Sequence, residues 1–195
     1  LLFLSVVAGM INALTATQNG QLAEVCGRLS SVMIVHVVGL TVALCWYAFR
    51  RRTLPPKRPT APWMYLGGVI GVGTVLFLNT AYAGVAVTAI MALSMLGQTL
   101  TSIAVDHFGL LNAQKKPFAF SRLLAVLAVA AGAAIMILPM RSGSPVAALC
   151  ALGSGVTIVC ARTVNGQLAL RQSAMRSTVM NYATGLVTVS LLVLL

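Results

Sequence analysis

Acidic residues are almost absent from this sequence. Its 195 residues include two, Glu24 and Asp106, against thirteen lysines and arginines. Charged residues make up only 8% of the chain, whereas 59% are hydrophobic and the mean hydropathy is +0.96. A soluble domain of this length carries far more charge, so the composition excludes a water-soluble globular fold.

The scarcity of ionisable side chains also argues against catalysis. The sequence has no paired carboxylates, no Ser/His/Asp set and no cluster of metal ligands at catalytic spacing. We therefore expect a protein that is not an enzyme and that has no metal and no cofactor. The cysteines show no paired spacing and read as small packing residues, with a disulfide or metal role as the alternative. They are Cys26, Cys45, Cys150 and Cys160.

Aromatic residues are also few, at 6% of the chain, although the net charge is +11. Such a positive charge could suggest a nucleic-acid partner. The basic residues, however, lie in short segments between apolar runs and have no aromatic residues interleaved with them. We therefore expect no nucleic-acid binding and interpret the positive charge as a signal of membrane topology.

Long apolar runs recur along the chain, and each is long enough to cross about 30 Å of hydrocarbon as a helix. The sequence therefore predicts an all-α, polytopic membrane helix bundle with seven transmembrane helices. We expect these helices at about residues 1–17, 30–49, 62–79, 85–105, 121–139, 145–162 and 177–195.

Eleven of the thirteen basic residues fall in alternate loops, which span residues 50–58, 115–122 and 162–176. The remaining two, Arg28 and Arg141, lie on the other side. Because cationic loops stay in the cytoplasm, this pattern puts the N-terminus and the ends of the even-numbered helices there.

The pentapeptide NGQLA occurs twice, at Asn19–Ala23 and Asn165–Ala169. A shift of 146 positions also aligns further glycine and polar residues. The alternative explanation is biased composition, but composition alone does not readily place such residues in register. We infer an internal repeat. The matched pairs are Gly9 with Gly155, Thr17 with Thr163, Ser31 with Ser177 and Gly39 with Gly185.

One repeat unit contains five helices. Because five is odd, the second unit enters the membrane from the opposite face, as in inverted-repeat transporters. We expect residues 1–140 to form the first unit and residues 145–195 to form the first two helices of the second. The first NGQLA is then exterior and the second cytoplasmic. Since Leu1 is not a methionine, we expect the sequence to be a fragment.

Three motifs support a resemblance to a known family. They are G-x9-N-x2-L (Gly9, Asn19, Leu22), PW-x3-GG-x2-G (Pro62, Trp63, Gly67, Gly68, Gly71) and GQ-x3-S-x3-DHFG (Gly97, Gln98, Ser102, Asp106 to Gly109). Their combination resembles the YdcZ family of the drug/metabolite transporter superfamily, over residues 1–140 and again over 145–195. The resemblance implies a bacterial inner-membrane exporter of five helices or of ten fused helices.

Polar residues at membrane depth are candidates for a substrate pathway, because burying them costs energy. Their alternative role is hydrogen bonding between helices. For His36 the two interpretations are a proton carrier and a neutral interhelical donor. For Asp106 they are a coupling role and a pairing with nearby basic residues. The candidates are Asn12, Thr15, Asn19, Gln21, His36, Gln98, Ser102, Asp106, Asn165, Gln167 and Asn181.

Several glycines recur between the repeat units or at G-x3-G spacing, which allows helices to approach closely. We expect them to act in helix packing, with a hinge role as the alternative. They are Gly9, Gly39, Gly67, Gly71, Gly155 and Gly185.

The sequence therefore predicts a secondary transporter that moves a small solute by alternating access, with a non-transporting membrane subunit or scaffold as the alternative. Its partners would be the lipid bilayer and a small-molecule substrate, and a homodimer remains open. Because most pathway candidates are uncharged amides and hydroxyls, we expect a solute that is not strongly charged.

Overall fold

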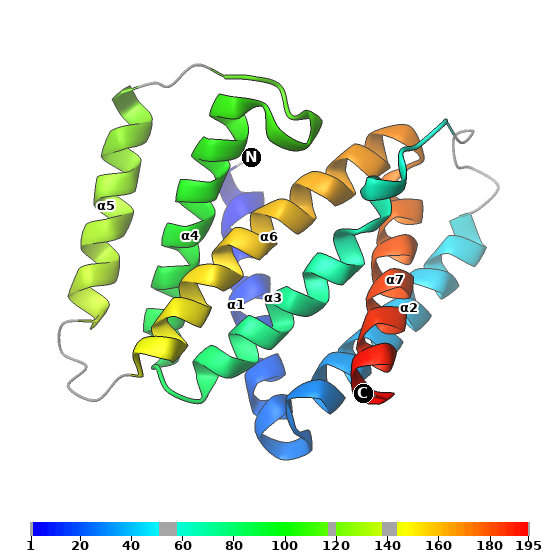
Figure 1. Ribbon diagram of the computed structural model, residues 1–195, viewed down its shortest axis with the longest axis horizontal. Coiled ribbons are helices and arrows are strands. Elements are labelled where there is room, and N and C mark those ends of the chain that lie inside the picture. The colour runs from blue at the N-terminus through cyan, green and yellow to red at the C-terminus, as the bar shows by residue number, and fades with distance from the viewer. Residues whose placement is uncertain (1, 51–57, 117–119, 138–143, 195) are drawn as a thin grey trace.

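The computed structural model describes residues 2–50, 58–116, 120–137 and 144–194. Within these ranges the chain forms seven α-helices and no strand, as expected for a helical membrane protein (Figure 1). The helices are α1 (Leu2–Cys26), α2 (Arg28–Arg50), α3 (Gly67–Tyr82), α4 (Val87–Phe108), α5 (Phe120–Ile137), α6 (Pro145–Arg171) and α7 (Ala174–Leu194). Short 3-10 turns, η2 (Pro62–Tyr65) and η3 (Leu110–Asn112), precede α3 and follow α4.

The surface of the bundle is apolar, as a lipid environment requires. Four described helices, α2, α4, α6 and α7, are long and apolar enough to cross a membrane, and α3 is a shorter apolar helix. Large hydrophobic side chains such as Met10, Trp46 and Leu149 point outward and are more than half exposed. Because helices satisfy their own backbone hydrogen bonds, they can present such side chains to lipid.

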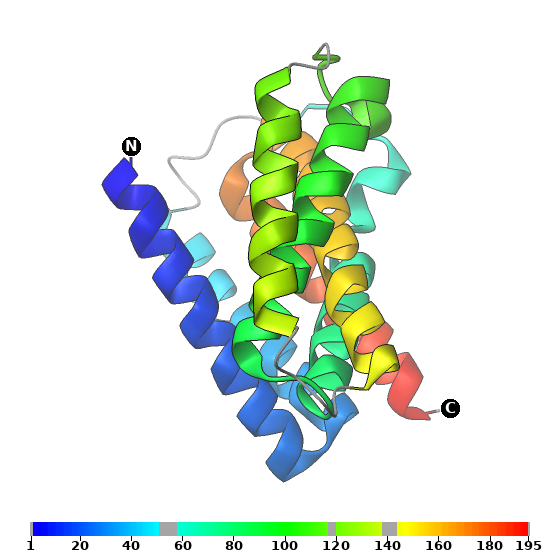
Figure 2. The ribbon, with the colours of Figure 1, turned by 90° about the vertical axis from the view of Figure 1, so that its left-hand side faces the viewer.

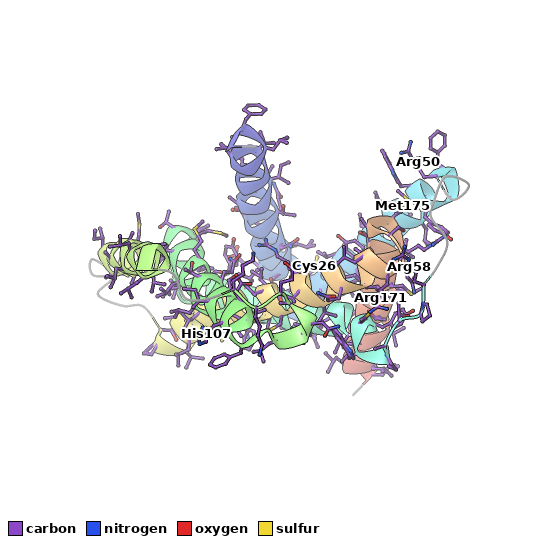
Figure 3. All side chains as sticks on the ribbon, turned by 90° about the horizontal axis from the view of Figure 1, so that it is seen from above. Cys26, Arg50, Arg58, His107, Arg171 and Met175 are labelled. Carbon is purple, nitrogen blue, oxygen red and sulfur yellow. The ribbon has the colours of Figure 1, made fainter. Side chains whose placement is uncertain are left out.

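Basic residues gather at one end of the bundle. The C-terminal ends of α2, α4 and α6 lie there, together with η2 and the start of α7 (Figure 1). Figure 3 looks onto this end and shows Arg50, Arg58 and Arg171 near one another. We call it the cationic end, and its described members are Arg50, Arg58, Lys115, Lys116, Arg171 and Arg176.

Two small cores hold the bundle together. Helix α6 lies between α3 and α4, where Ala81, Ile90, Leu93 and Ala151 are buried against one another. Helices α2, α3 and α7 meet at a second core of valines, which are Val32, Val72 and Val189. Within the described residues, helix α5 packs mainly against α4. Helix α1 stands apart from α4 and α5 (Figures 2 and 3).

The ends of two predicted helices were wrong. The expected loop after residue 17 is helical, so the first NGQLA lies inside α1, which continues to Cys26. Gly27 alone separates α1 from α2, and its φ of +84° is one that glycine adopts without strain. In the same way α6 continues through the second NGQLA to Arg171. Both pentapeptides lie near the C-terminal end of their helix.

One consequence concerns Arg162, which we expected at the edge of a cytoplasmic loop. It lies within α6, nine residues before the last residue of that helix. The repeat contained the signal for this correction, because the position 146 residues earlier, Ala16, was already expected to be helical.

The two halves of the repeat share a local structure. In the α1–α2 hairpin the Ser31 hydroxyl donates to the Asn19 carbonyl at 3.3 Å. In the α6–α7 hairpin the repeat-equivalent Ser177 donates to the Asn165 carbonyl at 2.8 Å. The two hairpin turns lie at opposite ends of the bundle (Figure 1).

Repeat-equivalent residues also meet directly between α2 and α7. The His36 ring packs on Gly185, and the Tyr182 ring packs on Gly39. His36 and Tyr182 are themselves 6.0 Å apart between ring centroids, in an edge-to-face arrangement of 76°. We call these four residues the aromatic–glycine seam. Each glycine leaves room for the ring that the other half contributes.

Candidate functional site

A cleft of about 370 Å³ opens between α4 and α5. It contains three of the candidate pathway residues, because Gln98, Ser102 and Asp106 are spaced by four and therefore share one face of α4. All three side chains are half-buried. The lining residues are Gln98, Thr99, Ser102, Ile103, Asp106 and Ala125.

A line of hydrogen bonds connects the cleft to α6. Arg162 Nη1 donates to Gln98 Oε1 at 3.2 Å, and Gln98 Nε2 donates to Ser94 Oγ at 3.4 Å. Behind them the Ser154 hydroxyl donates to Ser94 Oγ at 3.0 Å, and both serines are buried. Gln98 is thereby held from both sides, with its oxygen toward Arg162.

Two glycines bring α4 and α6 close enough for these contacts. A Cβ on Gly155 would overlap the Ser94 carbonyl oxygen and lie 2.7 Å from Gln98 N. A Cβ on Gly97 would overlap the Leu152 carbonyl oxygen. Because the obstructing atoms are backbone, neither position can accept a larger residue without separating the helices.

Asp106 lies where the cleft meets the cationic end. Its carbonyl oxygen accepts a hydrogen bond from Lys116 N at 2.9 Å, which folds the segment after η3 back onto α4. Gly109 ends α4 with a φ of +66°, which permits this reversal.

A second polar cluster joins α6 and α7 to α3. Asn165 Nδ2 donates to Asn181 Oδ1 at 2.7 Å. The side chain of Asn165 also packs on Gly67, and the carbonyl of Asn181 packs on Gly68. These two candidates therefore satisfy each other across the α6–α7 hairpin, and they do not line the cleft described above.

The remaining candidates are placed separately. His36 is buried in the aromatic–glycine seam, with Nδ1 2.8 Å from the Val32 carbonyl of its own helix. Gln167 Nε2 donates to the Asn112 carbonyl at 3.1 Å, near the cationic end. On α1, Thr15 donates to the Ile11 carbonyl and is exposed, as is Gln21. The side chain of Asn12 lies outside the described residues.

The packing glycines differ in their surroundings. Gly39, Gly67, Gly155 and Gly185 each face another helix at close range, as described above. The nearest such atom to a Cβ on Gly71 would be Asn181 Oδ1, at 3.9 Å, which is ordinary contact. Among the described atoms, none outside its own helix lies within 4 Å of a Cβ built on Gly9.

Sequence reasoning missed Arg162 because it placed the residue at the boundary between the expected helix 145–162 and the basic loop after it, and counted it only for topology. The described residues hold no group of three or more histidine, cysteine or acidic side chains that could bind a metal ion. All four cysteines are free thiols.

Comparison with known protein families matches residues 1–135 to the family titled "Putative inner membrane exporter, YdcZ". The match covers more than half of the chain, from α1 to near the end of α5. The chain belongs to the YdcZ family. It is therefore a multi-pass protein of the inner membrane from a family of membrane exporters, which is not a family of enzymes.

No curated protein and no solved structure gave a match to the sequence or the fold. The pattern GQ-x3-S-x3-D, on which the resemblance to the YdcZ family partly rested, runs from Gly97 to Asp106. These residues lie on α4, and the Gln, Ser and Asp of the pattern are among the six residues that line the cleft.

Proposed function

We propose that this protein exports a small solute across the bacterial inner membrane along the polar face of α4. The observation that supports this most directly is that Gln98, Ser102 and Asp106, which lie in the segment that resembles the YdcZ family, line one cleft. Polar groups at membrane depth are costly to keep, and a cleft of about 370 Å³ has the size of a small-molecule site.

The mechanism we propose is alternating access by two inverted units, residues 1–140 and residues beginning at 145. Support comes from the matching hydrogen bonds of Ser31 and Ser177 and from the opposite placement of the two hairpin turns. Two related halves of opposite orientation can exchange conformations, so an inward-open state becomes outward-open.

We also propose that the cationic end faces the cytoplasm. Most of the described basic residues gather there, whereas Arg162 lies within α6 and Arg28 lies at the opposite end, beside the α1–α2 turn. By the positive-inside rule, this orientation also places the N-terminus in the cytoplasm.

The proposal is tested by solute flux into proteoliposomes that contain the purified protein. The panel should include anionic, cationic, zwitterionic and neutral solutes, and saturable counterflow would distinguish a carrier from a channel. We expect Gln98→Ala to lower the initial rate about tenfold, since it removes a hydrogen-bonding group worth about 1.4 kcal/mol at the site.

The matched control is Thr101→Ala. Thr101 lies on the same helix, but its hydroxyl donates to the Gly97 carbonyl at 2.8 Å and is not part of the cleft lining. This variant should keep its flux. If the wild-type protein moved no member of the panel, the result would favour the non-transporting scaffold.

A further inference from the structure

Arg162 is a charged residue placed well inside a membrane helix. It lies nine residues before the end of α6, which is about 14 Å along the helix axis at 1.5 Å per residue. Its repeat equivalent is Ala16, although the neighbouring pair Thr17 and Thr163 is conserved between the halves. The charge therefore belongs to one half only. Its side chain is exposed, and an arginine within a membrane-spanning helix is costly unless it has a partner or a function.

The direction of its side chain argues against a purely topological role. Gly155 contacts the backbone of Gln98, so the two residues lie at the same height in the bundle. Gly155 precedes Arg162 by seven residues on α6, so this height is about 10 Å further from the cationic end than Arg162. The guanidinium bonds to Gln98 and so points toward the membrane interior. An arginine that only anchored the helix would extend the other way, toward the headgroups.

The partner of this guanidinium is a neutral amide. Among the residues that the structure describes, its one hydrogen-bond acceptor is Gln98 Oε1, whereas a guanidinium has five N–H donors. Its planar array of donors matches the oxygens of a carboxylate or a phosphate. Arg162 is not among the residues that line the cleft, but its guanidinium bonds to Gln98, which is one of them, and therefore lies next to the Gln98 end of the cleft.

We propose that Arg162 binds the anionic group of the transported solute, a carboxylate or a phosphate-type group, at the Gln98 end of the cleft. Gln98 positions the guanidinium, because its amide nitrogen is held by Ser94 and its oxygen faces Arg162. This inference rests on the proposed export function and names its substrate class. It replaces the expectation of a solute that is not strongly charged, which was drawn from the amides and hydroxyls and left Arg162 out of the pathway.

The test measures the charge preference of the cleft without requiring transport. Ser102→Cys is introduced into a variant whose four native cysteines are replaced by alanine, and the protein is placed in nanodiscs, where both ends are accessible. Labelling rates are measured for an anionic methanethiosulfonate (the ethylsulfonate) and a cationic one (the ethyltrimethylammonium). Each rate is divided by the rate of the same reagent with free 2-mercaptoethanol.

We expect the anionic reagent to be favoured at residue 102, and Arg162→Gln to reduce the anion-to-cation ratio roughly thirtyfold. This estimate assumes about 8 Å between the guanidinium and the charge of the reagent and an effective dielectric constant of about 40. The charge of Arg162 then speeds the anionic reagent and slows the cationic one by similar factors, and the ratio changes by the product of the two. Arg162→Lys retains the charge and should retain most of the ratio. Arg176→Gln removes one charge from the cationic end, where its guanidinium bonds to Gln172 O, and should change the ratio little.

If Arg162→Gln does not fold, the comparison of Ser102→Cys with Thr88→Cys remains. Thr88 is exposed near the other end of α4 and should show no anion preference. The proposal would be overturned if residues 102 and 88 gave the same anion-to-cation ratio. It would also be overturned if the ratio at residue 102 were the same in the Arg162 protein and in Arg162→Gln.

Protection experiments then identify the anion. Acetate or inorganic phosphate, added during labelling by the neutral methyl methanethiosulfonate, should slow the reaction at residue 102 in the Arg162 protein and not in Arg162→Gln. Acetamide, the neutral match of acetate, should have no effect. Protection by acetate indicates a carboxylate and protection by phosphate a phosphate-type group, whereas protection by neither would overturn the assignment. Because labelling needs no turnover, the anion-binding result can be read even if the protein exports no solute. Failure of this inference and failure of the export function are therefore distinguishable.

Discussion

Replacing Gly155 by alanine should separate α6 from α4. The new Cβ would overlap the Ser94 carbonyl oxygen and lie 2.7 Å from Gln98 N and 2.9 Å from the Gly97 carbonyl carbon. Ordinary contacts between heavy atoms lie at about 3.5–4.0 Å, so the helices must part by roughly 1 Å. All three obstructing atoms are backbone, which cannot rotate away.

The cost has two parts. Overpacking of a close helix contact costs about 1–3 kcal/mol, and the hydrogen bonds from Ser154 to Ser94 and from Arg162 to Gln98 would lengthen beyond useful range. Interhelical hydrogen bonds in membranes are worth about 0.6 kcal/mol each on average. We therefore expect a loss of about 2–4 kcal/mol and a fall in Tm of roughly 5–10 °C.

The assay is thermal unfolding in detergent, followed with a thiol-reactive dye. Cys150 and Cys160 are half-buried in α6 and become reactive when the helix leaves the bundle. Two controls are available. Gly166→Ala lies on the same helix, and Gly9→Ala is the repeat equivalent; among the described atoms, neither added Cβ would meet a neighbour within 4 Å. Both should leave Tm unchanged or raise it, because alanine favours helix over glycine. Equal shifts for Gly155 and Gly166 would refute the close α4–α6 contact.

Three further results are expected. Ser177→Ala removes the 2.8 Å hydrogen bond to the Asn165 carbonyl and should lower the free energy of unfolding by about 1 kcal/mol in the same dye assay. In Gly39→Ala the new β-carbon meets the movable ring of Tyr182, so the substitution should lower the free energy of unfolding by about 1–2 kcal/mol. In a Tyr182→Ala background the same substitution should cost clearly less, and strictly additive effects would contradict the contact between the two residues. Cysteines placed at Gln21 and at Gln167 should react with an impermeant maleimide from opposite faces of the membrane in cells, and labelling from one face would end the inverted-repeat proposal.

Much of the architecture was predictable because membrane helices have a strong one-dimensional signal. The seven apolar runs gave the number and order of the helices, and the resemblance of Gly97–Asp106 to the YdcZ motif identified the family, which the comparison with known families confirmed. The errors were at helix ends. The expected helices ended at residues 17 and 162, yet Asn19 and Asn165 both lie in helices, and their carbonyls accept hydrogen bonds from serines twelve residues later.

The candidate site was less predictable, because it depends on which helices pack together. Gln98 and Arg162 are 64 positions apart, and nothing in the periodicity of either helix specifies that α4 lies against α6. Small residues such as Gly97 and Gly155 show that a close contact exists, but they fit any partner that offers an equally small surface. The pairing of Asn165 with Asn181 was hidden for the same reason.

The aromatic–glycine seam restricts how α2 can move on α7. Each ring rests on a glycine of the opposite helix, and the two contacts are related by the repeat. A slip of one helical turn, about 5.4 Å, would carry both rings onto residues that have β-carbons, such as Val35 or Ala43 on α2 and Asn181 or Val189 on α7. Sliding of α2 along α7 is therefore opposed at both contacts. If these helices change their relative position, they should do so in a discrete step in which the two rings lose their contacts with Gly185 and Gly39 together.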